Sequence, residues 1–300
     1  MNRVLGLSLV GFNEREAIRN HQEQFPSLQW ELSYKMSERF LSEVEPIIAD
    51  RVVSVHACCP SESIFPNFGS RDEAVLSESF EALKRTFKTA RRFGAKIVVL
   101  HPGYVADDKI PASNAEREAL LAGSSFAPYV GVEKGSICRA DYPKSEVYRQ
   151  HFERARKSLI TLSAMAKEAG LQLAAENLNP RVAYLIQTPE EMVSLASASD
   201  DLFLCLDVGH LWIASQVYGF DYLEGIKQIL ATKKVITAHI HSNPSDRAAQ
   251  VFVDSHDGID RHSFDYRTIL KLLADSGANI ILETVCSPKQ NTLLLYEALR

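Results

Sequence analysis

Carboxylate and imidazole side chains recur in this sequence where apolar, β-branched runs end. Six stand at the last residue or two of VVSVH, KIVVLH, LQLAAE, LFLCLD, VITAHIH and NIILE, and three more follow within short loops. In chain order the nine are His56, His101, Glu176, Asp207, His210, His241, Asp254, His256 and Glu283. Parallel strands present their carboxyl ends at one rim of a sheet or barrel, so the pattern predicts a single site there.

These residue types favour a divalent cation. Glu176, Asp207, His241 and Glu283 would project from four successive strand ends, and carboxylates with one imidazole suit Mn²⁺ or Zn²⁺. The set contains no thiolate, which argues against a closed structural zinc site. The motifs DVGH at 207–210 and DSH at 254–256 would place further ligands on short loops near the same rim.

Strands and helices alternate along the chain. The sequence predicts strands near 4–9, 28–33, 52–57, 96–101, 171–176, 202–207, 235–241 and 279–284. Between them, apolar residues recur at helical spacing, most clearly in 72–93 and 145–169. Eight such units in 300 residues favour an α/β fold, a (β/α)8 TIM barrel forming one domain over 1–300. An open doubly wound sheet fits less well, because it would gather its site at one switch point.

Several helix boundaries are marked in the sequence. Thr188-Pro189-Glu190-Glu191 predicts an N-cap, a first-turn proline and a capping-box carboxylate, and Ser287-Pro288 predicts the same device near the C-terminus. Gly94 and Gly170 stand where helices should end before strands.

One segment interrupts the regular spacing. About forty residues rich in Pro, Gly, Ser and charge, at about 103–145, follow the fourth strand. A loop this long in a compact domain is usually functional or disordered. We interpret it as an insertion that forms a lid over the barrel mouth, the alternative being a decoration with no part in catalysis.

Composition and charge bound the class of protein. Hydrophobic residues make up 46% and charged residues 24% of the chain, as in a globular protein with a sizeable core. The net charge of −5 gives no support for a polyanionic partner. Five scattered cysteines without a CxxC pair indicate reduced thiols and a cytoplasmic location. The N-terminal apolar stretch is interpreted as a strand, and no run is long enough to span a membrane.

The ordered series VHACCP, VVLHPGY, AAENLN, CLDVGH, HIHSNP, DSHDGID and ILETV resembles the xylose isomerase-like TIM-barrel superfamily. That group includes sugar and sugar-phosphate isomerases and epimerases, and the endonuclease IV group of AP endonucleases (AP endonuclease family 2). The resemblance covers essentially the whole chain apart from the insertion. For the isomerase branch it implies one divalent metal held by Glu176, Asp207, His241 and Glu283, with the two glutamates moving protons on either face of a sugar carbon.

For the endonuclease branch the resemblance implies three zinc ions on nine ligands. The three sets would be His56, His101 and Glu176; Glu176, Asp207, His241 and Glu283; and His210, Asp254 and His256. The chain departs from that branch where Cys59 replaces an expected aromatic wedge. It departs from both branches where DGID, and not a glycine-acid-glycine run, follows DSH. An endonuclease also needs basic loops to bend a duplex, and the loop after the second strand offers only Lys35 and Arg39.

We therefore expect a divalent-metal-dependent sugar or sugar-phosphate isomerase or epimerase in which Glu176 and Glu283 act as acid and base. The alternative is a tri-zinc, endonuclease IV-like phosphoester hydrolase. A barrel that only binds a ligand is a third hypothesis, which the full set of ligand types argues against. The cofactor would be one to three ions of zinc or manganese, and the partner a small-molecule sugar or sugar phosphate. Nucleic acid is disfavoured, no membrane is implicated, and the oligomeric state stays open.

The remaining candidates are substrate contacts and residues with two interpretations. His210, Trp212 and Tyr104 are expected to contact the substrate, the two aromatic rings by stacking or, equally, as core residues. His56 and His101 could instead be hydrogen-bonded core histidines or substrate donors, and the DSH motif could be a solvated loop. His239 is expected to face the other side of its strand and to play a structural part.

Overall fold

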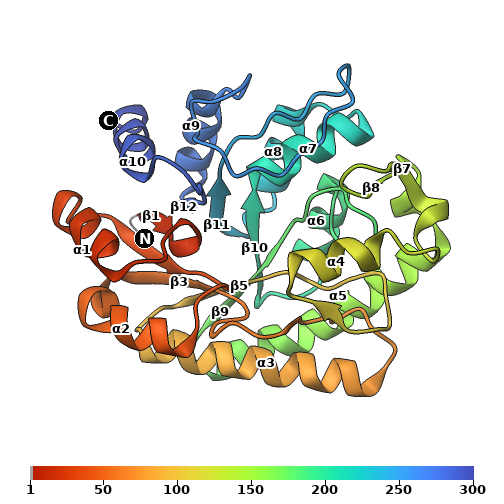
Figure 1. The fold of residues 1–300 in the computed structure, drawn as a ribbon, viewed down its shortest axis with the longest axis horizontal. Helices are drawn as coiled ribbons and strands as arrows, with labels where there is room; N and C mark the ends of the chain where they lie inside the picture. The colour runs from red at the N-terminus through yellow and green to blue at the C-terminus, as the bar shows by residue number, and fades with distance from the viewer. Residues whose placement is uncertain (1–2) are drawn as a thin grey trace.

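Eight parallel strands close into a barrel in the computed structural model, which describes residues 3–300 (Figure 1). Strands that are neighbours in the barrel also follow one another along the chain, and β12 pairs with β1 to close the ring. They are β1 (Leu5–Ser8), β2 (Gln29–Leu32), β3 (Val52–His56), β5 (Ile97–Leu100), β9 (Gln172–Glu176), β10 (Leu202–Asp207), β11 (Val235–Ile240) and β12 (Asn279–Leu282). The predicted (β/α)8 barrel and all eight predicted strands are confirmed.

Helices follow the strands and lie on the outside of the barrel (Figure 1). They are α1 (Arg15–Gln24), α2 (Glu38–Ile48), α3 (Glu73–Arg92), α5 (Glu146–Glu168), α6 (Pro189–Ala196), α7 (Val208–Tyr218), α8 (Tyr222–Leu230), α9 (Tyr266–Ser276) and α10 (Pro288–Ala298). The two longest, α3 and α5, match the predicted helical stretches, and Gly94 and Gly170 end them with φ of +70° and +74°. Within residues 3–300, no helix combines the length and apolar character needed to cross a bilayer.

The apolar core fills the space between the outer face of the barrel and the helices. Leu173 on β9 and Leu204 on β10 are fully buried, as are Leu159 and Leu162 on α5. Each buried leucine contributes about 1.5–3 kcal/mol relative to exposure. This packing fixes the outward side chains of the strands, so the inward side chains at the strand ends share a rigid frame.

The two predicted caps have different outcomes. Thr188 forms the full capping box with Glu191 at the start of α6, as predicted. Ser287 adopts φ +47° and makes no capping hydrogen bond, so the cap predicted there is wrong. A capping side chain works from an extended backbone, which Ser287 lacks. Asn291 fixes this loop instead, by donating to Thr284 Oγ1 (3.0 Å) and to the Cys286 carbonyl (2.8 Å).

The segment between β5 and α5 contains elements of its own. They are β6 (Ile110–Pro111), α4 (Asn114–Leu121), β7 (Val130–Val132) and β8 (Ile137–Cys138). β6 pairs with β4 (Ile64–Phe65) from the loop after β3, and Ile137 bridges to Arg181 from the loop after β9. In Figure 1, α4, β7 and β8 lie on the side of the molecule away from α1 and α10. The segment is therefore tied to two loops that leave the carboxyl end of the barrel.

Replacing Thr188 with alanine should lower the free energy of unfolding by about 1–2 kcal/mol, because it removes the oxygen that caps α6. That oxygen accepts from the Glu191 backbone N–H at 3.4 Å. Urea unfolding followed by circular dichroism measures the change. Thr188→Ser keeps the oxygen and is the matched control, so equal stability of the alanine and serine variants would contradict a capping contribution.

Candidate metal centre and active site

The carboxyl end of the barrel brings all nine predicted residues together with His239. They form three groups, in each of which the potential ligand atoms lie within 4.8 Å of one another. The groups are His56, His101 and Glu176; Glu176, Asp207, His239 and Glu283; and His210, His241, Asp254 and His256. The first group is the set that the resemblance implies. The second contains His239 where the implied set has His241, and the third contains His241 in addition to its three implied ligands.

Glu176, the last residue of β9, belongs to two of these groups and, with Cys205 and His239, to a further one. Its Oε2 lies 3.0 Å from His56 Nε2 and 3.6 Å from His101 Nε2, and its Oε1 lies 3.2 Å from His239 Nδ1. The residue is fully buried. Burial alone would raise the pKa of Glu176, but the imidazoles of His239 and His56 bring it well below the ordinary value. Glu176 is therefore an anion at neutral pH in spite of its burial.

His239 points into the barrel, and the expectation that it faces the other side of β11 is wrong. Residues two apart in a strand share a face, so His239 and His241 both point inward, with His239 one layer deeper. His239 Nδ1 lies 3.2 Å from Glu176 Oε1, 3.3 Å from Glu283 Oε2 and 3.8 Å from Asp207 Oδ2. His239 thus approaches all three carboxylates through one ring nitrogen.

Glu31 on β2 is a buried carboxylate that the sequence analysis missed. It accepts a hydrogen bond from Ser54 Oγ at 2.7 Å and lies 3.0 Å from His239 Nε2. The His239 ring thus has carboxylates at both nitrogens. Burial alone would lower the pKa of His239, but Cys205 and the surrounding carboxylates raise it well above the ordinary value. The available signal was a glutamate inside an otherwise apolar strand, LQWELS.

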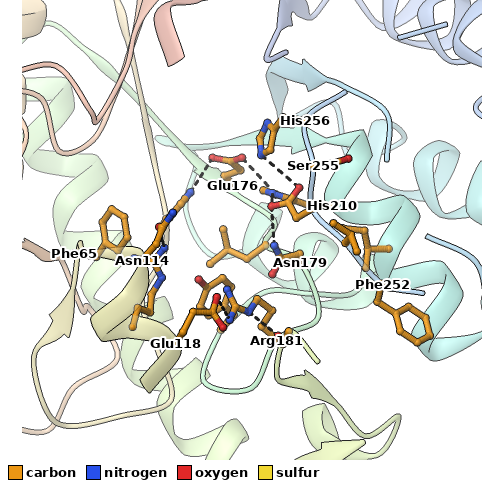
Figure 2. A pocket seen from close by; sticks show the side chains of 18 of the residues that line it. Phe65, Asn114, Glu118, Glu176, Asn179, Arg181, His210, Phe252, Ser255 and His256 are labelled. Atoms are coloured by element: carbon orange, nitrogen blue, oxygen red, sulfur yellow. Dashed lines mark hydrogen bonds and ion pairs between the residues drawn. The ribbon is translucent and has the colours of Figure 1, made fainter. Parts of the chain in front are cut away.

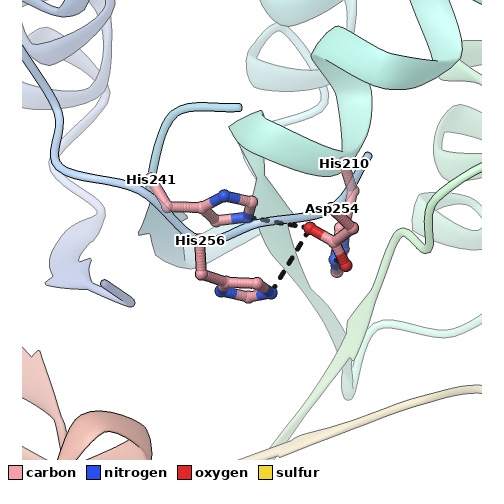
Figure 3. A group of neighbouring side chains, drawn as sticks. All are labelled: His210, His241, Asp254 and His256. Atoms are coloured by element: carbon pink, nitrogen blue, oxygen red, sulfur yellow. Dashed lines mark hydrogen bonds and ion pairs between the residues drawn. The ribbon is translucent and has the colours of Figure 1, made fainter. Parts of the chain in front are cut away.

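His241 lies in the third group, on the loop side of the mouth (Figure 3). Its ring stacks on that of His256, with centroids 3.9 Å apart and planes at 14°. Asp254 joins the group through Oδ2, 3.1 Å from His210 Nε2, and Oδ1, 3.4 Å from His256 Nε2. Asn179 Nδ2 donates to the same Asp254 Oδ2 at 2.8 Å. The loop after β11 therefore folds back over the end of the barrel.

Asn177 holds Asp207 in place and was not among the predicted site residues. Its side-chain oxygen accepts from the Asp207 backbone N–H and its amide donates to the Asp207 carbonyl, both at 2.9 Å. Asp207 Oδ1 in turn accepts from the His210 N–H at 2.6 Å and caps α7. The turn between β10 and α7 thereby places Asp207 in the second ligand group and His210 in the third.

The donor atoms of the centre fit a divalent cation. Asp207 Oδ2, His241 Nε2 and Asp254 Oδ1 are buried and have no hydrogen-bond partner within residues 3–300. His241 Nε2 lies 3.2 Å from Asp207 Oδ1, without hydrogen-bond geometry. Unpartnered buried polar atoms are costly, and oxygen and imidazole donors of this kind suit Zn²⁺ or Mn²⁺.

A cavity of about 530 Å³ opens above the centre (Figure 2). Glu176, His210 and Glu283 line it, and so does Tyr104. Among residues 3–300, Trp212 is not part of the cavity lining. Its indole N–H donates to the Ser245 carbonyl at 3.0 Å, and its ring packs against that of Tyr222. The predicted substrate contact of Trp212 therefore has no support in the geometry.

The chain matches a protein-family model and a curated relative. The family model described as "Xylose isomerase-like TIM barrel" matches residues 24–300. A curated relative, the uncharacterized protein MJ1614 of Methanocaldococcus jannaschii, is 21% identical over 185 residues, or 62% of this chain. The match spans about half of that relative's length, 54%.

Solved structures of similar fold cover nearly the whole chain. A D-tagatose 3-epimerase-like protein has a TM-score of 0.69 at 18% identity, covering 100% of this chain and 97% of that one. D-Psicose 3-epimerase with D-tagatose from Clostridium cellulolyticum has a TM-score of 0.65 at 13% identity, with coverage of 100% and 97%. A Thermus thermophilus protein, TTHB071, soaked with ZnCl2, has 0.62 at 16% identity, with coverage of 99% and 98%. At these identities the likeness shows the fold.

Metal binding should release protons at pH 7. Burial alone would lower the pKa of His256, but Asp254 raises it to about 9, so the metal-free protein carries an imidazolium there. A cation binds only the neutral ring, so zinc affinity should rise with pH up to about 9. Calorimetry in buffers of different ionisation enthalpy counts the protons, and a count of zero would contradict the assignment of His256.

The same pKa shift predicts the pH dependence of the metal-free fold. A histidine whose folded pKa is raised stabilises the fold fully below its unfolded value of 6.5, and this stabilisation is lost as pH rises through about 9. Thermal unfolding of metal-free protein between these pH values should therefore show a falling melting temperature.

Gly209→Ala should weaken the third group. A methyl group at Gly209 would overlap the ring atoms of His241, so the ring must leave its position in the third group. We expect zinc affinity of this group to fall by about 10–100-fold, as for other changes that disorient a ligand. Gly225→Ala adds a methyl group to α8, away from the centre, and is the control. Equal zinc content of the two variants after dialysis would argue against His241 as a ligand.

Proposed function

Because this chain belongs to the xylose isomerase-like TIM-barrel family, we propose that its barrel mouth is the active site of a divalent-metal-dependent sugar isomerase or epimerase. The observation that carries the proposal is that Glu176 and Glu283, two buried carboxylates, line one cavity at the end of the barrel. The shared fold with a D-tagatose 3-epimerase-like protein and with D-psicose 3-epimerase supports a sugar as the substrate.

Glu176 and Glu283 would be the proton-transfer pair. A bound cation would polarise the oxygens of the substrate and make the adjacent carbon-bound proton more acidic. Burial alone would raise the pKa of Glu283, but His239 and His256 bring it well below the ordinary value, so both glutamates are ionised and can accept a proton. His239 Nδ1 contacts both, at 3.2 Å and 3.3 Å, and keeps their relative position. The glutamate that removes the carbon-bound proton becomes an acid and can return it to the neighbouring carbon, which gives isomerisation. Epimerisation needs the other glutamate to take up a proton from water and deliver it to the opposite face of the carbon.

The insertion would complete the active site as a lid. Tyr104, Asn114, Lys134 and Ile137 come from about 103–145, and all four line the cavity. A wall from this segment would keep water away from a carbanion-like intermediate. The antiparallel pairing of β6 with β4 gives it an attachment to the barrel.

A tri-zinc phosphoester hydrolase is the second candidate, and the third ligand group is the observation that favours it. His210, His241, Asp254 and His256 form a complete set of four potential ligands beside the carboxylate group. Other features argue against a duplex substrate. Cys59, where a wedge is expected, is fully buried. The exposed large apolar residues within 3–300 are Val251, Val285 and Leu293, none of them aromatic.

Incubation with ketoses and ketose phosphates in deuterated water tests the proposal. Deuterium should enter the substrate carbon, and Glu283→Gln should slow its entry by about 10²–10⁴-fold, as expected for loss of an acid–base group. Mass spectrometry or proton NMR measures the exchange. Glu116→Gln, an exposed change on α4, is the control and should exchange at the original rate.

An abasic DNA duplex in parallel reactions tests the hydrolase. Metal-dependent strand cleavage without deuterium entering any sugar would overturn the isomerase and support the second candidate. Cleavage that weakens steeply with salt would indicate direct contact with the phosphate backbone.

A further inference from the structure

Four cationic side chains contribute to the wall of the cavity. They are Lys35, Arg117, Lys134 and Arg181. Figure 2 shows Arg181, paired with Glu118, at the end of the cavity away from Glu176 and His256. The ligand-rich carboxylates and these cations therefore line the same cavity.

Arg117 on α4 is the most deeply placed of these cations. Its exposed fraction is 8%. Its Nη1 donates to the carbonyl oxygens of Pro111 and Ala112, both at 3.0 Å, and its Nη2 donates to Asn114 Oδ1 at 2.6 Å. Its Nε is buried and has no hydrogen-bond partner within residues 3–300. Within the described part of the chain, the Nε–H is therefore unpartnered and shielded from solvent, which adds to the cost of burying the guanidinium.

The charge of Arg117 also lacks a counter-charge. All its hydrogen-bond acceptors are neutral, and no carboxylate within residues 3–300 forms an ion pair with it. Arg181 differs, because its Nη2 lies 2.8 Å from Glu118 Oε1. A buried charge without an opposite charge is costly, so an anion bound in the cavity would offset that cost at Arg117.

We propose that this wall binds an anionic group on the substrate, a phosphate or a carboxylate, with Arg117 as the residue that selects it. The inference rests on the proposed function and narrows its substrate to a sugar phosphate or a sugar acid. Phe65 lies close both to Arg117 and to a candidate metal ligand: its ring centre is 4.9 Å from Arg117 Cζ and 6.0 Å from the ring centre of His101. A guanidinium is suited to this role because its planar fork matches phosphate and carboxylate oxygens.

Three sugars and inorganic phosphate test the inference with the metal-loaded full chain. D-Fructose, D-fructose 6-phosphate and D-fructuronate are compared by deuterium exchange, and inorganic phosphate is titrated by calorimetry. Arg117→Gln should lower kcat/KM for an anionic sugar by about 10–100-fold, as for loss of a charged hydrogen bond, and leave D-fructose nearly unchanged. Phosphate affinity should fall in parallel. Arg139→Gln is the control, since Arg139 is exposed and pairs with Asp141 at 3.0 Å.

The comparison of these substrates distinguishes a phosphate group from a carboxylate. It also distinguishes failure of this inference from failure of the proposed function. A loss confined to the phosphate ester identifies a phosphate, and a loss confined to the fructuronate identifies a carboxylate. Equal loss for D-fructose overturns the inference. So does an outcome in which Arg117→Gln leaves both the phosphate affinity and kcat/KM for D-fructuronate unchanged. Exchange with none of the sugars would count against the proposed function, and phosphate affinity alone would then decide the role of Arg117.

A second variant covers the case in which Arg117→Gln does not fold. Lys134 is exposed, lines the same cavity and has no ion-pair partner within residues 3–300. Lys134→Gln should lower phosphate affinity by up to about fivefold, the scale of a solvent-exposed charge pair. Unchanged phosphate affinity in Lys134→Gln would overturn the proposal that the cationic side chains of this cavity bind an anion.

Discussion

Burial of the Glu176 carboxylate among imidazoles is the constraint on which the barrel mouth depends. An unpaired carboxylate in this position would cost several kcal/mol. His56 on β3 and His239 on β11 compensate it at 3.0 Å and 3.2 Å, so side chains from three strands meet around one charge. In the same arrangement Asp207 Oδ2, His241 Nε2 and Asp254 Oδ1 have no hydrogen-bond partner within residues 3–300. The side chains that stabilise the metal-free barrel mouth are therefore also those that could bind a cation.

The strand ends were predictable because each buried run stops at a side chain that an apolar strand would not otherwise contain. The inward or outward direction of a residue inside a strand was harder to predict. Both faces of a parallel barrel are buried, so the strands show no apolar–polar alternation from which to assign a face. Glu31 was missed for this reason. The error at His239 was different, because its spacing of two from His241 already placed both residues on one face.

Helix faces and loop contacts were less accessible to sequence reasoning. Most of α7 is buried, so its pattern does not show that His210 faces the cavity while Trp212 packs on Tyr222. Arg117 reads as an ordinary helical arginine between two glutamates. Its burial arises from β6 and from Phe65 on β4, a tertiary contact between segments about fifty residues apart whose pairing no local signal specifies. The site's ligand types could thus be predicted, but the partition of ligands between groups and the lining of the cavity could not.

The contacts of the two Glu176 oxygens bear on whether the site carries out proton transfer or hydrolysis. Its Oε2 faces His56 and His101, whereas Oε1 faces His239 and the other carboxylates. A cation held by Glu176 with Asp207 and Glu283 would leave Oε2 in contact with His56, and Glu176 could exchange a proton there. If His56 and His101 held a further cation, Glu176 would be one of its ligands and would not be available for proton transfer. Burial lowers the pKa of His101 to about 3. Burial alone would also lower the pKa of His56, but Glu176 raises it above the ordinary value, so a cation at that position would have to displace a proton from His56. Occupancy of the His56–His101 group, which the fold permits but does not dictate, would therefore determine whether Glu176 can act in proton transfer.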